Sequence, residues 1–170
     1  MSSKVNSDSQ PASNKKTDCS NLLIIFISII ILAAATSIFS VLTAHQPVRL
    51  DAEYYDSSTV TDITKEEYEK LISEHKSFIV LVDNPGCITA ERMRQMLSEL
   101  PDSLQFKYYR LMWEDTKQSS LHQYVQYYPS LAIVKDGKVV AHLKADSDAD
   151  APVYNNPSDL EKWLSDHIVF

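Results

Sequence analysis

The chain has 170 residues, which is enough for one ordinary domain with additional segments, and its formal net charge of −7 excludes the clustered basic surface that nucleic acids require. It contains only two glycines, which excludes glycine-rich phosphate loops and indicates that each glycine marks a backbone position that needs one. Its two cysteines, Cys19 and Cys87, flank a long apolar segment, so they cannot form a disulfide within one chain if that segment spans a membrane.

The apolar segment runs from Leu22 to Leu42 without a charged residue, and it is long enough to cross the hydrocarbon core of a bilayer. Three lysines precede it and only Arg49 soon follows, so the positive-inside bias places the N-terminus in the cytoplasm and the domain outside. We predict a single-pass anchor in the cell membrane over residues 22–44, after a disordered cytoplasmic tail over residues 1–21. The alternative is a signal peptide cleaved near Ala33 to Ala35, which also exports the domain.

After the anchor, residues 45–60 have the composition of an extended polar spacer, and residues 61–170 that of a folded domain. The domain begins with a helix, because Thr64 and Glu67 have the spacing of a capping box. The apolar side chains that follow repeat at helical spacing as far as His75.

Strands and helices then alternate. A continuous apolar run at 78–82 predicts a strand buried on both faces, and Asn84-Pro85-Gly86 ends it. Asp-Gly between two apolar runs predicts a hairpin over 131–143. The other predicted elements are helices at 87–100, 119–127 and from 157 onward, a strand at 104–112, and an acidic loop at 146–156. This order predicts a parallel first pair of strands, a hairpin in the same sheet, and helices on both faces.

This order of elements, with Cys87 at a strand-to-helix junction and Pro129 just before the hairpin, resembles the thioredoxin-like superfamily. Cys87-Ile88-Thr89-Ala90 stands where that superfamily carries C-x-x-C, and Tyr128-Pro129-Ser130 resembles its cis-proline segment. The resemblance covers residues 63–169 and implies an α/β fold, a thioredoxin-like mixed sheet flanked by helices, here preceded by a single transmembrane helix. Within the superfamily, the chain is most similar to bacteriocin transport accessory proteins of Gram-positive bacteria, which have a similar F-I-V strand before the cysteine turn.

The cysteine motif departs from the superfamily pattern. Ala90 occupies the position of the second, resolving cysteine, and no tryptophan precedes Cys87. Asp83 lies closer to the cysteine than the buried acid of thioredoxins does, so that role is not carried over to it.

A cysteine in the first turn of a helix lies at the positive end of the helix dipole, which favours the thiolate that attacks disulfides. Cys87 is therefore the candidate nucleophile, but with Ala90 one turn later it needs an external thiol to release a mixed disulfide. Glu91 disfavours the thiolate, and Arg92 and Arg94 oppose that effect if they face the sulfur. Two functions remain open: a non-catalytic or weakly active accessory module that binds exported peptides or membrane partners, and monothiol exchange through Cys87.

A peptide or protein partner is expected near Cys87 and Pro129. If Pro129 is cis, its turn lies beside Cys87, and the backbone at Tyr128 can pair with an extended peptide as an added strand. If Pro129 is trans, it merely begins a strand. The candidate substrate-binding residues are Tyr128, Pro129, Ser130, Ile88 and Thr89.

No metal or cofactor is expected. Asp146, Asp148 and Asp150 alternate as at the start of a calcium loop, but Ala151 and Pro157 stand where such a loop requires glycine and glutamate. The histidines also lack metal-ligand spacing; they are His45, His75, His122, His142 and His167.

Overall fold

The computed structural model describes residues 25, 27, 29, 47–55 and 59–170. Contacts divide the chain into two units, Met1–Ala44 and His45–Phe170, of which the second contains the folded domain. The predicted cytoplasmic tail and nearly all of the predicted anchor lie outside the described residues. Within the described part of the chain, no helix is both long and apolar enough to cross a membrane.

The second unit is built on one five-stranded sheet with the order β1-β3-β2-β4-β5. Strands β1 (Val60–Ile63) and β2 (Phe78–Asp83) each pair in parallel with β3 (Tyr108–Met112). Strand β4 (Ser130–Lys135) is antiparallel to β2, and β5 (Lys138–His142) is antiparallel to β4. The predicted thioredoxin-like mixed sheet, with a parallel pair and a hairpin in one sheet, is confirmed.

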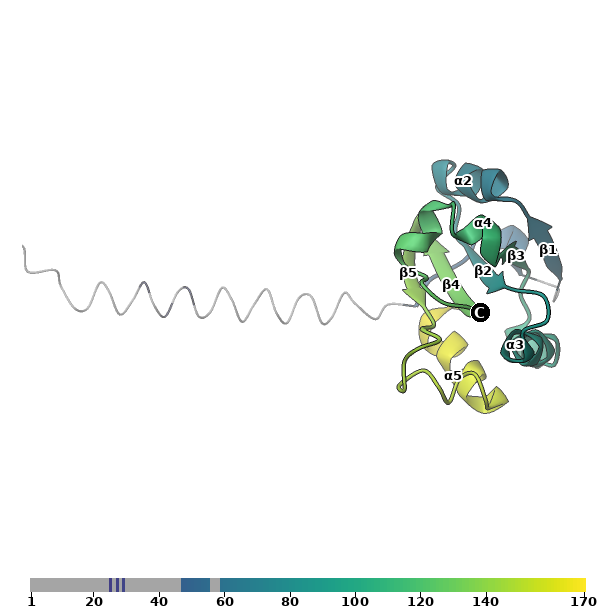
Figure 1. The fold of residues 1–170 in the computed structure, drawn as a ribbon. Helices are drawn as coiled ribbons and strands as arrows, with labels where there is room; N and C mark the ends of the chain where they lie inside the picture. The colour runs from purple at the N-terminus through teal and green to yellow at the C-terminus, as the bar shows by residue number, and fades with distance from the viewer. Residues whose placement is uncertain (1–24, 26, 28, 30–46, 56–58) are drawn as a thin grey trace, which may run out of the picture. The chain divides into compact units, whose positions relative to one another are not determined.

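Helices flank the sheet on both sides. In Figure 1, α2 (Lys65–Ser73) and α4 (Trp113–Thr116) lie toward one side, and α3 (Ile88–Ser98) and α5 (Pro157–His167) toward the other. Three short 3-10 helices complete the described elements; they are η1 (Ala52–Tyr54), η2 (Asp102–Leu104) and η3 (Ser120–Gln123).

Local side-chain bonds fix where the helices begin. The Glu67 carboxylate accepts a hydrogen bond from the Thr64 N–H at 2.8 Å, and Thr64 Oγ1 accepts one from the Glu67 N–H at 3.3 Å, so the predicted capping box is present. The Asn156 side chain caps α5, whose first residue is Pro157, a position at which proline loses no helical hydrogen bond.

The core follows the two central strands. Every residue of β2 is buried, as are the first five residues of β4, which is expected for strands covered on both faces. The Phe78 ring packs edge-on against Tyr68 and Tyr109 from the flanking elements, at centroid distances of 6.1 and 5.5 Å. This rigid centre holds the ends of β2 and β4, where the candidate site lies.

Two predicted elements differ from those observed. Only residues 108–112 of the predicted 104–112 strand form β3, because η2 occupies the residues before it. The predicted helix at 119–127 is instead the short η3, preceded by α4. Ser119 explains this break: its hydroxyl donates to the Thr116 carbonyl and accepts from the Leu121 N–H, and these local bonds compete with a longer helix.

The segment expected to be an extended spacer packs on the domain over its described part. Val48, Leu50 and Tyr54 are buried. The Val48 N–H donates to the His167 carbonyl at 2.7 Å, and the Val48 carbonyl accepts from the Val169 N–H at 2.9 Å. These residues therefore belong to the core. The alternation of Val48 and Leu50 is too short to stand out among polar neighbours.

Candidate functional site

Cys87 is the residue that caps the N-terminus of α3. Its N–H donates to the Asn84 carbonyl at 3.2 Å, and Gly86 has a φ of 81°. With Pro85 before that glycine, this is the pattern of a type II turn, and it carries the chain directly from β2 into α3. Cys87 is a free, partly exposed cysteine whose side chain makes no capping hydrogen bond, so its sulfur is available to a partner.

The residues after Cys87 differ sharply in exposure. Ile88 is 80% exposed and Thr89 is exposed, whereas Ala90 is completely buried. The position at which a second thiol would act is thus occupied by a methyl group packed into the domain. Cys87 has no partner thiol one turn away, as the sequence predicted.

Arg94, one of the two basic residues of α3 considered in the sequence, forms ion pairs with two acidic residues. Its guanidinium group donates to the carboxylates of both Glu91 and Asp83. Burial lowers the pKa of Arg94, but these two hydrogen bonds outweigh it and raise the pKa above the usual value. The negative charge of Glu91 is therefore paired with Arg94 on the same helix.

Asp83, at the end of β2, is 1% exposed and is the centre of a group of paired charges, which we call the charged layer. Its Oδ2 atom accepts from Arg94 and lies 3.9 Å from Arg110 Nη1. Arg110 also donates two hydrogen bonds to Asp62, at 2.6 and 2.7 Å, and these lower the pKa of Asp62. Asp83 Oδ1 has no partner among the described residues. Sequence reasoning missed this layer because its members come from four separate elements.

The peptide bond between Tyr128 and Pro129 is cis, which decides between the two alternatives that the sequence left open. Among the described residues, no backbone group bonds to the N–H or the carbonyl of Tyr128, so both can pair with another chain. Ser130 is different: its side chain is buried and its hydroxyl donates to the Leu143 carbonyl at 2.7 Å. That hydroxyl is engaged inside the fold.

One hollow of about 230 Å³ brings together three of the predicted residues. Thr89 from α3 and Tyr128 and Pro129 from the proline turn line it, and the rest of its wall comes from Ala145, Ala151, Tyr154 and Asn155. These four belong to the segment predicted only as an acidic loop and to the residue just before it. The structure thus gives the site a second wall that the sequence did not reveal.

Trp113 is a further residue of the site, and the sequence did not reveal it. Its ring packs against Tyr128 at a centroid distance of 5.2 Å and against His122 at 5.7 Å. No tryptophan precedes Cys87, but α4 places one against the residue before the cis-proline. The wide separation of Trp113 and Tyr128 along the chain gave no local signal of this contact.

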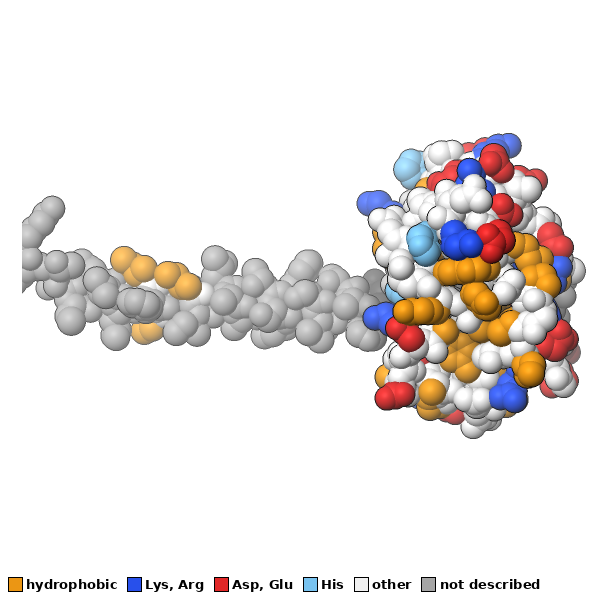
Figure 2. All heavy atoms as spheres, in the orientation of Figure 1, with side chains coloured by type: hydrophobic (Ala, Val, Ile, Leu, Met, Phe, Trp, Pro, Cys, Tyr) orange, Lys and Arg blue, Asp and Glu red, His pale blue; other side chains and the backbone are white. Residues whose placement is uncertain are grey.

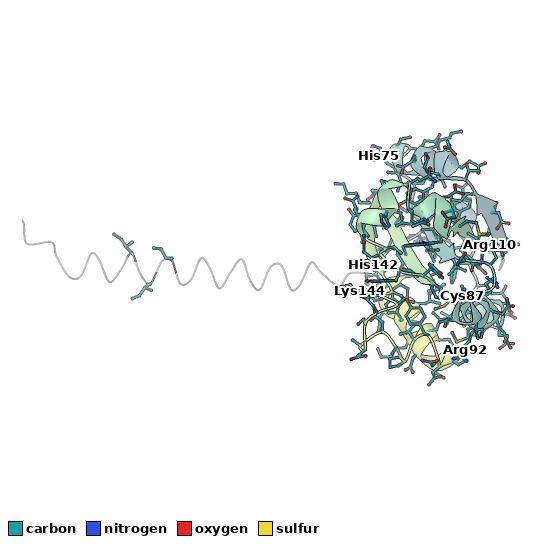
Figure 3. All side chains as sticks on the ribbon, in the orientation of Figure 1. His75, Cys87, Arg92, Arg110, His142 and Lys144 are labelled. Atoms are coloured by element: carbon teal, nitrogen blue, oxygen red, sulfur yellow. The ribbon has the colours of Figure 1, made fainter. Side chains whose placement is uncertain are left out.

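Apolar side chains gather on the face of the molecule that Figure 2 shows, where Figure 3 labels Cys87 in the same orientation. Next to the site in sequence, the exposed apolar side chains are Ile88 and Tyr127, the latter 56% exposed. A group of exposed apolar side chains beside unpaired backbone is typical of a surface that binds another chain.

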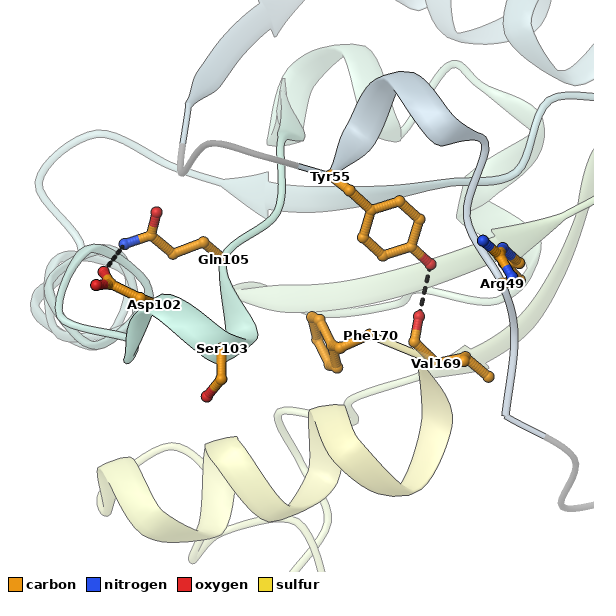
Figure 4. Close-up of a pocket in the computed structure, with 7 residues that line it drawn as sticks. All are labelled: Arg49, Tyr55, Asp102, Ser103, Gln105, Val169 and Phe170. Carbon is orange, nitrogen blue, oxygen red and sulfur yellow. Dashed lines mark hydrogen bonds between the residues drawn. The ribbon is translucent and has the colours of Figure 1, made fainter.

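The hollow of about 350 Å³ in Figure 4 lies elsewhere. Its lining includes Arg49, Phe170 and Tyr55, whose hydroxyl donates to the Val169 carbonyl at 2.6 Å. None of the predicted site residues lines it. Within the described ranges, no three histidine, cysteine or acidic side chains gather as a metal site.

Comparison with known proteins finds similar folds among solved structures only. Mitochondrial thioredoxin 3 from Saccharomyces cerevisiae is 19% identical over 63% of this chain and 94% of its own, with a TM-score of 0.47. Spinach chloroplast thioredoxin f is 15% identical over 68% and 96%, with a TM-score of 0.44. A chain from the complex of ferredoxin:thioredoxin reductase with thioredoxin f2 is 18% identical over 64% and 94%, with a TM-score of 0.47.

No family model matches the sequence, and no curated protein matches it. Similarities of this size to solved structures carry no argument about chemistry. The description of the sheet as thioredoxin-like therefore depends on the strand order, the parallel pair and the place of Pro129 before the hairpin.

Proposed function

We propose that this chain is a membrane-anchored, extracytoplasmic thioredoxin-like protein that binds exported peptides or a membrane partner. It acts as an accessory module with little or no catalytic turnover, comparable in role to the bacteriocin transport accessory proteins that its sequence resembles. The observation that carries this proposal is the combination of a buried Ala90 with an open backbone at Tyr128. The site retains a surface for a partner and lacks the second thiol that turnover requires.

The binding step follows from the groups that are free. A partner strand pairs with the N–H and carbonyl of Tyr128, because main-chain hydrogen bonds provide affinity in strand addition. Its side chains then contact Ile88 and Tyr127, whose exposed apolar surface is removed from water on binding. The Trp113 ring packs against the Tyr128 ring, and this contact holds the residue whose backbone pairs with the partner.

The binding role is tested with the full-length chain in detergent micelles and a fluorescent, cysteine-free peptide of alternating valine and threonine. We expect Cys87→Ala to bind the peptide as the parent does, and Ile88→Asp to bind it more weakly. Lys107→Asp, on an exposed residue between η2 and β3, is the control for a changed surface charge. Loss of binding in Cys87→Ala, with folding intact by circular dichroism, would contradict a role independent of the thiol.

A second function, monothiol exchange, is favoured by the partly exposed and unbonded sulfur of Cys87 at the start of α3. In that reaction the Cys87 thiolate attacks a partner disulfide, a mixed disulfide forms, and the other partner sulfur leaves as a thiolate. An external thiolate then attacks the partner sulfur of the mixed disulfide, forms a new disulfide with it, and releases Cys87 as a thiolate. The domain itself neither gains nor loses electrons overall.

Ala90→Cys separates the two functions. The new thiol lies one turn after Cys87 and can attack the mixed disulfide, leaving an internal disulfide and releasing the reduced partner. With dithiothreitol as the reductant, insulin reduction should rise from the background to a measurable rate if Cys87 is reactive. A rate that stays at the background, with the variant folded, supports binding alone.

The proposed anchor and its orientation are tested by labelling Cys19, which precedes it, and Cys87, which lies in the domain. In intact cells, a membrane-impermeant maleimide should label Cys87 and should label Cys19 only after the membrane is permeabilised. Labelling of both cysteines in intact cells would contradict the proposed orientation, and a soluble product that lacks Cys19 would indicate cleavage instead.

A further inference from the structure

The segment from Lys144 to Asn156 is a built wall of the site. Val153 and Tyr154 are buried, and the Tyr154 hydroxyl donates to the Pro129 carbonyl at 2.9 Å. On the other side, Arg92 of α3 donates to Asn155 Oδ1 at 2.6 Å. The segment is therefore attached both to the proline turn and to the helix that carries Cys87.

Hydrogen bonds between residues of this segment close its turns. The Asp150 carboxylate accepts from the Lys144 N–H at 2.8 Å, and the Asn155 amide donates to the Ala151 carbonyl at 2.8 Å. Burial raises the pKa of Tyr154 above its usual range, which keeps its hydroxyl protonated as a donor. Hydrogen bonds within the segment and to its neighbours therefore hold the wall in the observed conformation.

Two hollows meet along this wall. Ala145 lines both the 230 Å³ hollow beside Thr89 and Pro129 and a second one of about 250 Å³. The second hollow is formed by residues 124–127 on one side and 142–146 on the other. We call these two neighbouring hollows the loop groove; His142 and Lys144 of the second hollow are labelled at the left of the domain in Figure 3, and Arg92 at its lower right.

The far part of the loop groove suits a positively charged side chain. The rings of Tyr124 and Tyr127 are 40% and 56% exposed there, and aromatic faces attract cations. Asp146 lines the same hollow, is exposed, and forms no ion pair within the described ranges. Two more aspartates follow on the same wall, and the chain as a whole carries a charge of −7.

Two basic residues, His142 and Lys144, also line this hollow, and a positive charge on either would oppose a cationic ligand. Burial, followed by the charge of Lys144, lowers the pKa of His142, so His142 is mainly neutral at pH 7. Lys144 is exposed and remains the one cation of the lining, against Asp146 in the hollow and the two aspartates beyond it. The balance of charge and the exposed rings both favour a cationic ligand.

We propose that the loop groove selects extended peptides that carry a lysine or arginine side chain, which enters between Tyr124, Tyr127 and Asp146. This inference rests on the proposed peptide-binding function and names its ligand class. The peptide backbone pairs at Tyr128, and its basic side chain reaches along the groove toward Asp146.

The test compares three cysteine-free peptides that differ at one position, with arginine, glutamine or glutamate there. Binding to the full-length chain in detergent micelles is followed by fluorescence anisotropy at low salt. We expect the arginine peptide to bind about three- to tenfold more tightly than the glutamine peptide, and the glutamate peptide to bind most weakly.

Asp146→Asn should reduce the preference for arginine over glutamine by about threefold. Asp148→Asn is the matched control, because Asp148 lies on the same wall, is exposed, and does not line the groove. The preference of Asp148→Asn should fall by less than that of Asp146→Asn. Tyr127→Leu should weaken the arginine peptide more than the glutamine peptide, since the ring attracts the cation.

The outcomes separate this inference from the proposed function. If the glutamine peptide binds and the arginine peptide binds no better, the selectivity is wrong and the binding function stands. A preference for glutamate means that Lys144 dominates and also overturns the inference. If none of the three peptides binds, both are overturned.

Discussion

Gly86 and Gly137 are the only glycines of the chain, and both have positive φ, 81° and 73°. Their surroundings are opposite. A Cβ atom on Gly137 would overlap the carbonyl oxygen of Ile72, whereas one on Gly86 would meet no atom within 4 Å. Both turns therefore require a positive φ. The hairpin turn is closely packed, whereas the turn directly before Cys87 has open space beside its glycine. Open space of this kind beside a partly exposed cysteine suits a binding site, whereas a purely structural turn does not need it.

The hairpin turn has no free space beside its glycine because it is hydrogen-bonded to the segment that follows α2. The Gly137 N–H donates to the Lys76 carbonyl at 3.0 Å, and the Asp136 N–H donates to Ser77 Oγ at 3.0 Å. Asp136 also has positive φ, 50°, so the two residues have the signs of a type I′ turn, which matches the twist of a hairpin. Over the part of the chain that the structure describes, the backbone hydrogen bond from Cys87 to Asn84 is the only one that closes the turn before Cys87.

The largest expected effect is that of Gly137→Ala. The added methyl group meets the Ile72 carbonyl and the backbone stays at positive φ, so we expect a loss of about 3 kcal/mol in the free energy of unfolding. Gly86→Ala is the matched variant and should lose only about 1 kcal/mol, from the φ alone. Urea unfolding measures both. Equal losses would contradict the distinction between a packed and an open turn.

Arg94→Met tests the charged layer centred on Asp83, which ends the strand before the open turn. It removes the main partner of the buried Asp83 carboxylate, and we expect a loss of about 2–3 kcal/mol, somewhat less than for a fully buried pair because Arg94 is partly exposed. The double variant with Asp83→Asn should recover part of this loss. Arg92→Met, on the same helix, should cost less than about 1 kcal/mol because Asn155 is exposed. A similar cost for both arginines would refute the charged layer.

Tyr154→Phe tests whether the wall of the loop groove is as firmly held as the hairpin turn. It deletes the hydroxyl that donates to Pro129 and leaves a buried carbonyl unsatisfied, which should cost about 1–2 kcal/mol in urea unfolding. Tyr127→Phe is its control, because Tyr127 is exposed and should be nearly neutral. A neutral Tyr154→Phe would mean that the wall is held by packing alone.

The smallest effect concerns pH. Because burial lowers the folded-state pKa of His142, the unfolded chain binds a proton at this residue more readily than the folded one does as the pH falls through about 6.5. His142 therefore contributes stability above that pH and loses it below. His142→Asn should reduce the difference between the urea midpoints at pH 7.5 and 5.5. An unchanged difference would show that other groups cause the slope.

Signals confined to a few neighbouring residues predicted the fold well. The capping box at Thr64, the apolar run of β2 and the Asp136-Gly137 hairpin all appear where the sequence placed them. Cys87 at the start of α3 followed from the same kind of signal, since Asn84-Pro85-Gly86 must end a strand.

The rest of the site depends on contacts between distant residues, which no local pattern encodes. The Trp113 ring contacts Tyr128, Arg94 donates to Asp83, and Tyr154 donates to Pro129. In each pair the two residues come from different elements or loops. The acidic composition of the loop gave no sign that two of its residues are buried. The buried Val48 and Leu50 were overlooked because short edge pairings resemble polar linkers in sequence.

The pairing of Val48 with both neighbours of Ile168 has a mechanical consequence. A pull on the chain from the direction of residue 47 runs along this pairing, so its two hydrogen bonds are loaded together in shear. The residues that share this load are His167 and Val169, at the end of α5 and just beyond it. If the proposed anchor holds the chain under tension, the pairing of Val48 with residues 167–169 is therefore an early part of the folded domain to bear the load.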